Sequence, residues 1–238
     1  MSNEQRHLTV DVWLLGLDRD PEFVERYRGV LSPDELERAS RLRSFNLRAD
    51  FIYTRGALRH ILSDHAGVAP SEIRFTYEDR GKPHLITSHG GDGIGFNVSH
   101  SRDISVFAIA HGRPVGIDVE QIRNDYDHDP IAERWFSSRE NELLGQLPEK
   151  DQTAGFFAVW SRKEALVKAL GTGISHRLSS FSVSVSPTQP AAILETAWDP
   201  SQIDAWSIHD IPLPQGYSGA VVAAGQDWSP VFRAWSHP

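Results

Sequence analysis

The chain has 238 residues, 39% hydrophobic and 24% charged, with a net charge of −8, which suits one large domain or two smaller units and disfavours general nucleic-acid binding. It contains no cysteine, which excludes disulfides, thiol catalysis and cysteine-ligated metal sites. Because it has no run approaching roughly 18 apolar residues and no apolar signal segment near its first residue, we expect a cytoplasmic protein without a membrane helix.

The first half of the sequence predicts one strand, two helices and further strands. Alternating apolar residues over 8–14 predict the first strand. The sequence Ser-Pro-Asp-Glu at 32–35 is a capping box, which predicts a helix running to about Arg43. An apolar face within the next segment predicts a second helix, ended by Gly67. Further strands are expected at 73–77, 94–100 and 104–111, the last two joined as a hairpin.

The second half begins a similar pattern. Residues 115–120 predict a strand, and a capping box at 137–140 predicts a helix to residue 147. An apolar stripe over 156–170 predicts a second helix, which Gly171 should end. The remaining expectations are strands at 181–185, 205–208 and 218–223 and a surface loop at 186–201.

The repeated order of elements predicts an α+β fold with two subdomains. We place these at residues 1–112 and 113–234, and an internal duplication stays a hypothesis because the halves share little residue identity. The last four residues, 235–238, resemble the start of a streptavidin-binding affinity tag, so we leave them out of the expected fold.

The strand at 115–120 carries two acidic residues on one face. Side chains alternate along a strand, so its valine and isoleucine residues face a core while Gly116, Asp118 and Glu120 face the other way. Two neighbouring carboxylates are unfavourable unless they are solvated or hold a cation, and oxygen ligands suit Mg²⁺ or Mn²⁺. We expect open space beside Gly116. The alternative is an exposed strand with solvated charges.

The helix at 156–170 places charged residues at unusual positions. Glu164 lies at the edge of the apolar stripe and Lys163 lies within it. Charged side chains are rarely buried without a partner, so these positions indicate a function. The alternative is that Lys163 extends its ammonium group to solvent and that Glu164 pairs with Lys168 one turn later.

Together the two segments form a signature that resembles the Sfp-type 4′-phosphopantetheinyl transferases. That family combines a Gly-x-Asp strand with a later Trp-Ser-x-Lys-Glu-Ala-x-x-Lys helix, and both match here at 116–120 and 160–168. Three further blocks also resemble the family. These are Gly-Lys-Pro at 81–83, Phe-Asn-Val-Ser-His-Ser at 96–101 and Leu-Ser-Ser-Phe-Ser-Val at 178–183.

The resemblance implies a fold and a reaction. The implied fold has two subdomains related by a pseudo-twofold axis in one monomeric chain, each with a mainly antiparallel sheet and packed helices, and an active site between them. The implied reaction moves 4′-phosphopantetheine from coenzyme A to a serine of an acyl or peptidyl carrier protein and releases adenosine 3′,5′-bisphosphate. Carriers of fatty-acid, polyketide and nonribosomal peptide synthases all stay open, and the resemblance favours the last two.

The resemblance also implies roles for the charged residues. Asp118, Glu120 and Glu164 would bind Mg²⁺, or Mn²⁺ as the alternative ion, with the pyrophosphate of coenzyme A. The implied catalytic residues are Asp118, Glu164 as the base or a metal ligand or both, and Lys168, which stabilises charge on the pyrophosphate. Lys163 would do the same, or would pair with an acidic neighbour.

A larger set of residues is implied to contact coenzyme A. Alternatives stay open for three of them. Arg41 or Arg43 could make the contact in place of Arg38, and Arg38 and Arg55 could both be surface charges. His100 could have a structural role instead. The implied contact residues are Arg38, Arg55, Gly81, Lys82, Pro83, Ser99, His100, Asp118, Lys163 and Lys168.

The acidic chain must also recognise a carrier protein that is itself usually acidic. Long-range attraction cannot explain that contact, so we expect local apolar and basic groups within 123–136, including Tyr126 and Arg134, to provide it. Packing in the core is the alternative for Trp135 or Phe136.

Two other functions stay open. One is a non-catalytic module that binds coenzyme A or a carrier protein. The other is a different Mg²⁺-dependent phosphoryl or nucleotidyl transferase, although this sequence contains no P-loop that would support it.

Overall fold

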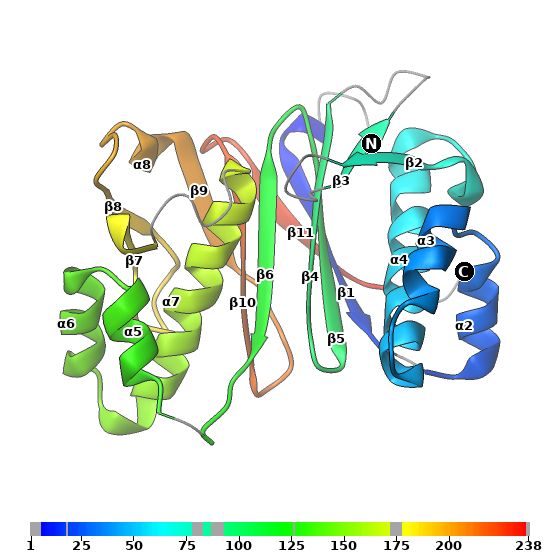
Figure 1. Cartoon of the computed structure of the whole chain (residues 1–238). Coiled ribbons are helices and arrows are strands. Elements are labelled where there is room, and N and C mark those ends of the chain that lie inside the picture. Colours follow the sequence, from blue (N-terminus) through cyan, green and yellow to red (C-terminus); the bar gives the residue numbers. More distant parts are fainter. Residues whose placement is uncertain are drawn as a thin grey trace.

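The computed structural model describes residues 6–17, 19–77, 83–86, 93–125, 127–171 and 178–236. These residues form four layers, with two β-sheets in the middle and helices on both outer sides (Figure 1). The first half of the chain provides the helices of one outer layer and the second half provides those of the other. The α+β prediction is confirmed.

The elements of the first half follow the predicted order with three additions, which are a helix at Pro21–Arg28, a 3-10 helix at Pro70–Glu72 and a strand at Pro83–Ile86. The capping box at Ser32 and the left-handed Gly67 are both present, as predicted. A helix that we did not predict begins at Pro21, where Asp20 accepts a hydrogen bond from the Glu22 amide. The elements are β1 (Thr9–Gly16), α2 (Pro21–Arg28), α3 (Pro33–Ser40), α4 (Phe45–Ala66), η1 (Pro70–Glu72), β2 (Arg74–Tyr77), β3 (Pro83–Ile86), β4 (Ile94–Ser101) and β5 (Ile104–His111).

The second half contains more elements than predicted. Its main helix begins at Glu149 instead of residue 156, and a strand occupies part of the segment 186–201 that we predicted as a loop. The elements are β6 (Val115–Gln121), α5 (Asp129–Trp135), α6 (Ser138–Gln146), α7 (Glu149–Leu170), η3 (Leu178–Ser180), β7 (Phe181–Val183), β8 (Ile193–Thr196), α8 (Gln202–Ala205), β9 (Trp206–Asp210), β10 (Tyr217–Ala224) and β11 (Ser229–Ala234).

The two main sheets do not divide at residue 112. One sheet has the order β11-β1-β5-β4 and the other has the order β6-β10-β9. Strand β11 pairs in parallel with β1, with Val12 opposite Phe232. The last strand therefore lies in the sheet of the first half, which corrects the simple boundary that placed residues 113–234 in the second subdomain.

Trp235 also belongs to the fold, unlike our expectation for the last four residues. Its amide donates to the Leu14 carbonyl at 2.8 Å, and its indole Nε1 donates to the Tyr27 hydroxyl at 2.8 Å. Its ring packs edge-to-face against Trp13. These contacts continue the pairing of β11 with β1 by one residue. The origin of residues 235–238 stays a prediction.

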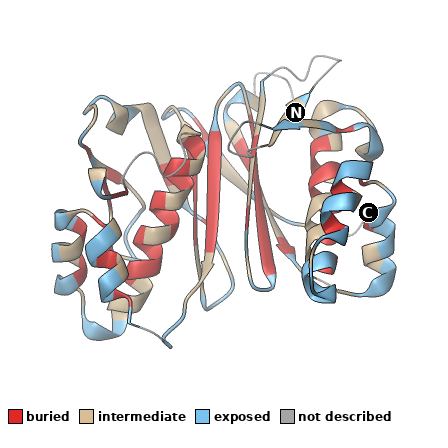
Figure 2. Ribbon diagram, in the orientation of Figure 1, coloured by how far each residue is buried: buried red, intermediate tan, exposed pale blue. Residues whose placement is uncertain are grey.

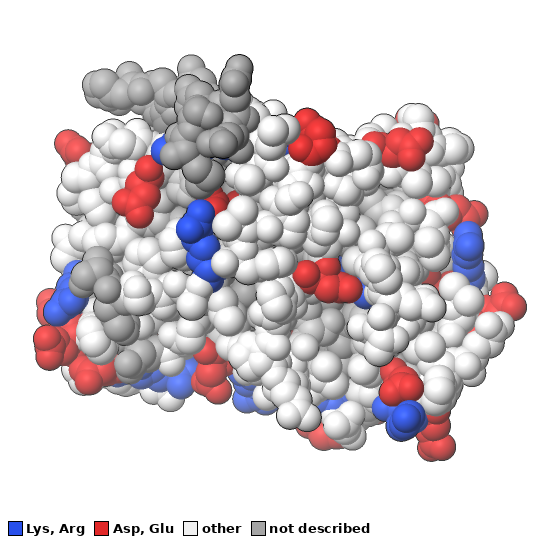
Figure 3. Space-filling view, turned by 180° about the vertical axis from the view of Figure 1, so that it is seen from behind, with Lys and Arg blue, Asp and Glu red and all other residues white. Residues whose placement is uncertain are grey.

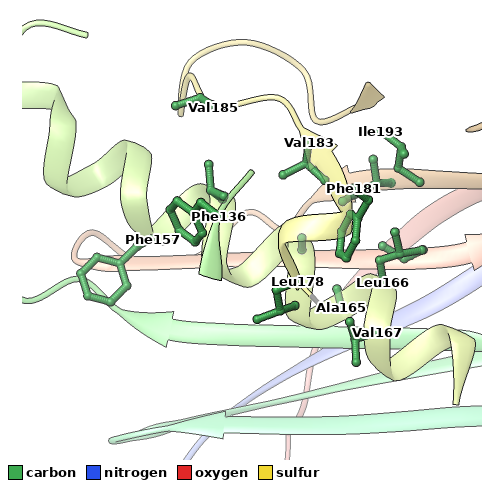
Figure 4. Close-up of a cluster of buried hydrophobic side chains, with 14 of the residues drawn as sticks. Phe136, Phe157, Ala165, Leu166, Val167, Leu178, Phe181, Val183, Val185 and Ile193 are labelled. Atoms are coloured by element: carbon green, nitrogen blue, oxygen red, sulfur yellow. The ribbon is translucent and has the colours of Figure 1, made fainter. Parts of the chain in front are cut away.

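Three apolar clusters join the layers, and Figure 2 shows buried residues along the central strands and the inner faces of the helices. One cluster lies between the two sheets and includes Val106, Ile117 and Val221. A second lies between the four-stranded sheet and α4. The third packs α7 against η3, β7 and β8, where Phe181 and Leu166 lie close together (Figure 4). Helix α7 is therefore held firmly over β6.

A buried polar cluster links β1, α4 and β5 beneath the first sheet. His65 Nδ1 lies 3.0 Å from His111 Nε2, and His65 Nε2 lies 3.7 Å from the Asp11 carboxylate. Arg233 of β11 holds the other oxygen of Asp11 at 2.9 Å. Burial lowers the pKa of His65 to about 4. The histidine is therefore neutral in the folded protein at pH values where the unfolded chain would be protonated.

We expect this histidine to make the protein sensitive to acid. Since the unfolded chain binds a proton near pH 6.5 and the folded chain near pH 4, the free energy of unfolding should fall as the pH drops through that window, by about 3 kcal/mol in total. Denaturant titrations at several pH values would measure it. A His65→Gln variant should have a shallower dependence than the wild type; equal slopes would refute the assignment.

Candidate active site

The candidate site forms where α7 crosses β6. At Gly116 the two backbones approach so closely that an added Cβ would collide with the backbone of Ala165 and Ala169. This corrects our expectation of open space, because the helix fills it. The crossing places the second face of β6, with Asp118 and Glu120, against the side of α7 that carries Glu164 and Lys168.

Asp118 is the central acidic group. Its side chain is almost fully buried, and its Oδ1 accepts hydrogen bonds from Ser99 Oγ at 2.8 Å and from Lys168 Nζ at 2.6 Å. Within the described residues, no donor reaches its other oxygen, Oδ2, which is also buried. Burial raises the pKa of Asp118, while Lys168 and Ser99 oppose that change. An unsatisfied buried carboxylate oxygen is costly and needs a partner.

The other two predicted carboxylates lie in the electric field of Asp118. Burial raises the pKa of Glu120 and of Glu164, and in both cases the negative charge of Asp118 raises it further while Lys168 lowers it. In the ranges that the structure describes, no three histidine, aspartate or glutamate side chains are already arranged to hold a metal ion. The three carboxylates thus interact electrostatically, with the Lys168 ammonium beside Asp118.

Lys163 points away from this site, which corrects its prediction as a coenzyme A contact. Its side chain is fully buried, and its Nζ donates to both oxygens of Glu140 at 2.7 Å and to the Phe181 carbonyl at 2.6 Å. Glu140 also accepts from the amides of Ser137 and Val183. Pairing with an acidic neighbour was the alternative for Lys163, and the structure favours it.

Strand β4 brings Ser99 and His100 to the site on different faces. Ser99 is buried and contacts both Asp118 and Lys168. His100 is exposed, so its imidazole is accessible to a ligand. Two further residues of this strand, Asn97 and Ser101, bond to β6 and were missed by our sequence reasoning. Their signal was the alternation Asn-x-Ser-x-Ser, in which the polar residues share one face.

Arg38 and Arg55 approach each other across helices α3 and α4. Both guanidinium groups lie near the Phe51 ring, at 5.5 and 6.0 Å from its centre. Arg55 is mostly buried, lies 3.1 Å from a Glu35 oxygen and donates to the Tyr77 hydroxyl at 3.2 Å. Burial lowers the pKa of Arg55, and the positive charge of Arg38 lowers it further.

Of the remaining predicted contacts, Pro83 lies in the hairpin of β2 and β3. Pro83 is paired with Tyr77 in this hairpin, which places it near Arg55. Gly81 and Lys82 lie outside the described residues. Among the alternatives to Arg38, Arg41 forms an ion pair with Glu37 on the surface.

Comparison with known proteins decides the family. Residues 114–223 match the model of the 4′-phosphopantetheinyl transferase superfamily. The 4′-phosphopantetheinyl transferase HetI of Nostoc sp. is 38% identical over 223 residues, which cover 94% of this chain and 91% of HetI. The chain belongs to the 4′-phosphopantetheinyl transferase superfamily. The predicted family, and its consequence that the chain is a transferase, are confirmed.

Two further comparisons extend this result. The 4′-phosphopantetheinyl transferase Sfp of Bacillus subtilis is 30% identical over 208 residues, covering 86% of this chain and 87% of Sfp. A solved structure, the holo-[acyl-carrier-protein] synthase of Thermotoga maritima, is 22% identical with a TM-score of 0.36 and covers 47% of this chain and 62% of that protein. The identity to HetI and Sfp shows that this chain is a phosphopantetheinyl transferase of the Sfp type.

The segment 123–136 of this phosphopantetheinyl transferase divides between core and surface. Phe136 is buried in the cluster under α7, as the packing alternative expected, while Trp135 is partly exposed with the Arg134 guanidinium 5.0 Å from its ring centre. Tyr126 lies outside the described residues. Exposed Arg134 and partly exposed Trp135 are among the groups of this segment that a partner could contact.

A hollow of about 890 Å³ lies between α5, α6 and the first turns of α7. Its lining includes four acidic residues and no lysine or arginine, so it does not suit an anionic coenzyme. The face in Figure 3 carries scattered acidic and basic groups without a broad basic area. In the described part of the chain, no helix is long and apolar enough to cross a membrane.

Proposed function

We propose that this phosphopantetheinyl transferase moves 4′-phosphopantetheine from coenzyme A to a serine of an apo acyl or peptidyl carrier protein. The observation that carries the proposal is the meeting of β6 and α7, which brings Asp118, Glu120, Glu164 and Lys168 into one electrostatic cluster. HetI and Sfp, which resemble this chain over most of their length, support the same reaction.

The carboxylates fit a Mg²⁺ ion, and Mn²⁺ is a substitute with similar ligands. Asp118 Oδ2 is buried and lacks a donor among the described residues, and all three side chains offer the hard oxygen atoms that Mg²⁺ prefers. Asp118, Glu120 and Glu164 would hold the ion. When bound, it would polarise the pyrophosphate of coenzyme A and neutralise charge on the leaving group.

Glu164 and Lys168 would do the work of the protein in the transfer step. Glu164 takes the proton of the carrier serine, with a pKa that burial and the charge of Asp118 raise above its ordinary value. The serine oxygen forms a bond to the phosphorus that carries pantetheine, and the bond from that phosphorus to the bridging oxygen of adenosine 3′,5′-bisphosphate breaks. Lys168 stabilises the negative charge that the leaving bisphosphate gains.

The nucleotide end of coenzyme A would lie against the first half of the chain. Arg38, Arg55 and His100 are the candidate phosphate contacts, with Pro83 of β3 and, by the resemblance alone, Gly81 and Lys82. Arg55 is already paired with Glu35, so it would act mainly by ordering this surface. Ser99 would position Asp118 and Lys168.

We further propose a cytoplasmic monomer that serves polyketide or nonribosomal peptide carriers. One chain contains both halves of the site, which supports the monomer. The partly exposed Trp135 and the exposed Arg134 would contact the carrier beside the acidic hollow.

Mixing the protein with coenzyme A, Mg²⁺ and a panel of apo carriers tests the proposal. Intact-protein mass spectrometry should detect one added phosphopantetheine on a carrier, and kcat/KM across the panel would rank the carriers. Coenzyme A binding without any mass shift would indicate the non-catalytic module instead. A carrier whose acceptor serine is replaced by alanine is the matched control and should stay unmodified.

A further inference from the structure

Strands β4 and β6 face each other as the edges of the two main sheets. Strand β4 ends the order β11-β1-β5-β4, and β6 begins the order β6-β10-β9. Both strands lie wholly within the described residues, and they are not paired by a backbone ladder. Edge strands normally leave backbone amides without partners. The junction of the two halves therefore needs another source of hydrogen bonds.

Side chains of β4 satisfy these amides. Asn97 Oδ1 accepts from the Ile117 amide at 2.9 Å, and Ser101 Oγ accepts from the Gln121 amide at 3.0 Å. The two acceptors are four residues apart along β4, and the two donors are four residues apart in the same order along β6. The strands therefore run in the same direction and stay in register. We call this contact the β4–β6 junction: Asn97, Ser99 and Ser101 against residues 117–121.

The same side chains reach the acidic site. Between the two amide contacts, Ser99 Oγ donates to Asp118 Oδ1 at 2.8 Å. Ser101 Oγ also lies 3.4 Å from Glu120 Oε2, in position to donate its proton there while it accepts from the Gln121 amide. One hydroxyl thus fixes both the backbone of β6 and one of its carboxylates.

A direct ladder could not do this. Strands in a ladder lie about 4.8 Å apart, which leaves no room for a serine hydroxyl or an amide group between them. Because no ladder joins β4 to β6, side-chain oxygens of β4 accept from the amides of β6 instead. Ser99 lies between these two acceptors along β4 and contacts Asp118 and Lys168.

We propose that Asn97 and Ser101 are positioning residues of the acidic site. Their oxygen atoms take the place of backbone carbonyls, dock β6 on β4 and so fix Asp118 and Glu120 relative to Ser99. Ser101 additionally orients the Glu120 carboxylate. This inference deepens the proposed function and rests on it, because the orientation of Glu120 matters for binding a divalent cation together with coenzyme A.

Ser101→Ala and Ser101→Thr separate positioning from folding. With saturating coenzyme A, a Mn²⁺ titration followed by electron paramagnetic resonance should give about tenfold weaker binding for Ser101→Ala, since groups that orient metal ligands contribute on that order. Ser101→Thr keeps the hydroxyl and should bind like the wild type. Arg102→Ala is the matched control: Arg102 Nε donates to the Gln121 side chain across the junction at 3.1 Å, and its loss should leave Mn²⁺ binding unchanged.

Hydrogen–deuterium exchange tests the junction independently of any metal. Asn97→Ala should speed exchange of the Ile117 amide and Ser101→Ala that of the Gln121 amide, while Asn97→Asp, which keeps an acceptor oxygen, should protect Ile117 as the wild type does. If Ser101→Ala does not fold, Ser101→Cys takes the place of that variant in both measurements. Cysteine removes the strong hydrogen bonds and has a similar side-chain volume.

The outcomes distinguish this inference from the proposed function. Wild-type protein that transfers phosphopantetheine, combined with wild-type Mn²⁺ affinity in Ser101→Ala, would overturn the inference and leave the function standing. A wild type that neither binds Mn²⁺ with coenzyme A nor modifies any carrier would overturn the function and, with it, the assigned role of Ser101. Unchanged exchange at Ile117 and Gln121 in the alanine variants would overturn the docking role of both residues.

Discussion

Replacing Glu164 with glutamine is expected to lower kcat for phosphopantetheine transfer by about 10³-fold, within the range that a positioned base contributes. Glutamine keeps the size and polarity of the side chain but cannot accept the proton of the carrier serine. Glu164 is half-buried on α7, and burial and the charge of Asp118 raise its pKa above that of a free glutamate. A raised pKa makes the ionised carboxylate a stronger base.

Two measurements beside kcat make this prediction specific. Coenzyme A binding by calorimetry should remain measurable in Glu164→Gln, and the acid limb of the wild-type pH–rate profile, which rises through the pKa of Glu164, should be absent from the variant's residual activity. Glu149→Gln, an exposed position on the same helix, is the control and should behave like the wild type. Activity that survives Glu164→Gln would show that another group is the base.

The local parts of this site could be predicted from the sequence because short-range patterns determine them. Alternation along 115–120 correctly separated the core face of β6 from its acidic face, and helical periodicity put Glu164 at the edge of an apolar stripe. Capping residues marked the starts of α3 and α6. These signals depend on neighbours within one or two turns.

The missed features depend on partners that are distant in the sequence. Strand β11 exists because β1, at the opposite end of the chain, offers an edge to pair with. The direction of Lys163 depends on Glu140 of another helix, and Asn97 finds its partner only when the two sheets meet. Periodicity cannot identify such partners. Gly116 shows the same limit, since we expected open space beside it and the backbone of α7 fills that space.

The buried pair of Lys163 and Glu140 ties α7 to the start of α6 and to β7. Both side chains are fully buried, and Glu140 accepts from the Ser137 amide at 2.7 Å and the Val183 amide at 2.8 Å as well as from Lys163. Burial lowers the pKa of Lys163 to about 8, while Glu140 opposes that change. The lysine therefore keeps its charge at neutral pH mainly because this carboxylate faces it.

We expect Glu140→Ala to lower the free energy of unfolding by about 3 to 5 kcal/mol at pH 7, because it leaves a buried ammonium uncompensated and two buried amides without their acceptor. Without Glu140 the pKa of Lys163 should fall further below that of the unfolded chain. Between those two pKa values the unfolded chain binds more protons than the folded chain, so the variant should regain part of its stability as the pH rises toward 10.

Denaturant titrations at pH 7 and pH 9.5 measure both effects. The control is Glu142→Ala at an exposed neighbouring position, which should change the free energy of unfolding by less than about 0.5 kcal/mol. A Glu140→Ala variant as stable as that control would show that the pair contributes nothing to holding α7 over β6, and the position of Glu164 would then need another explanation.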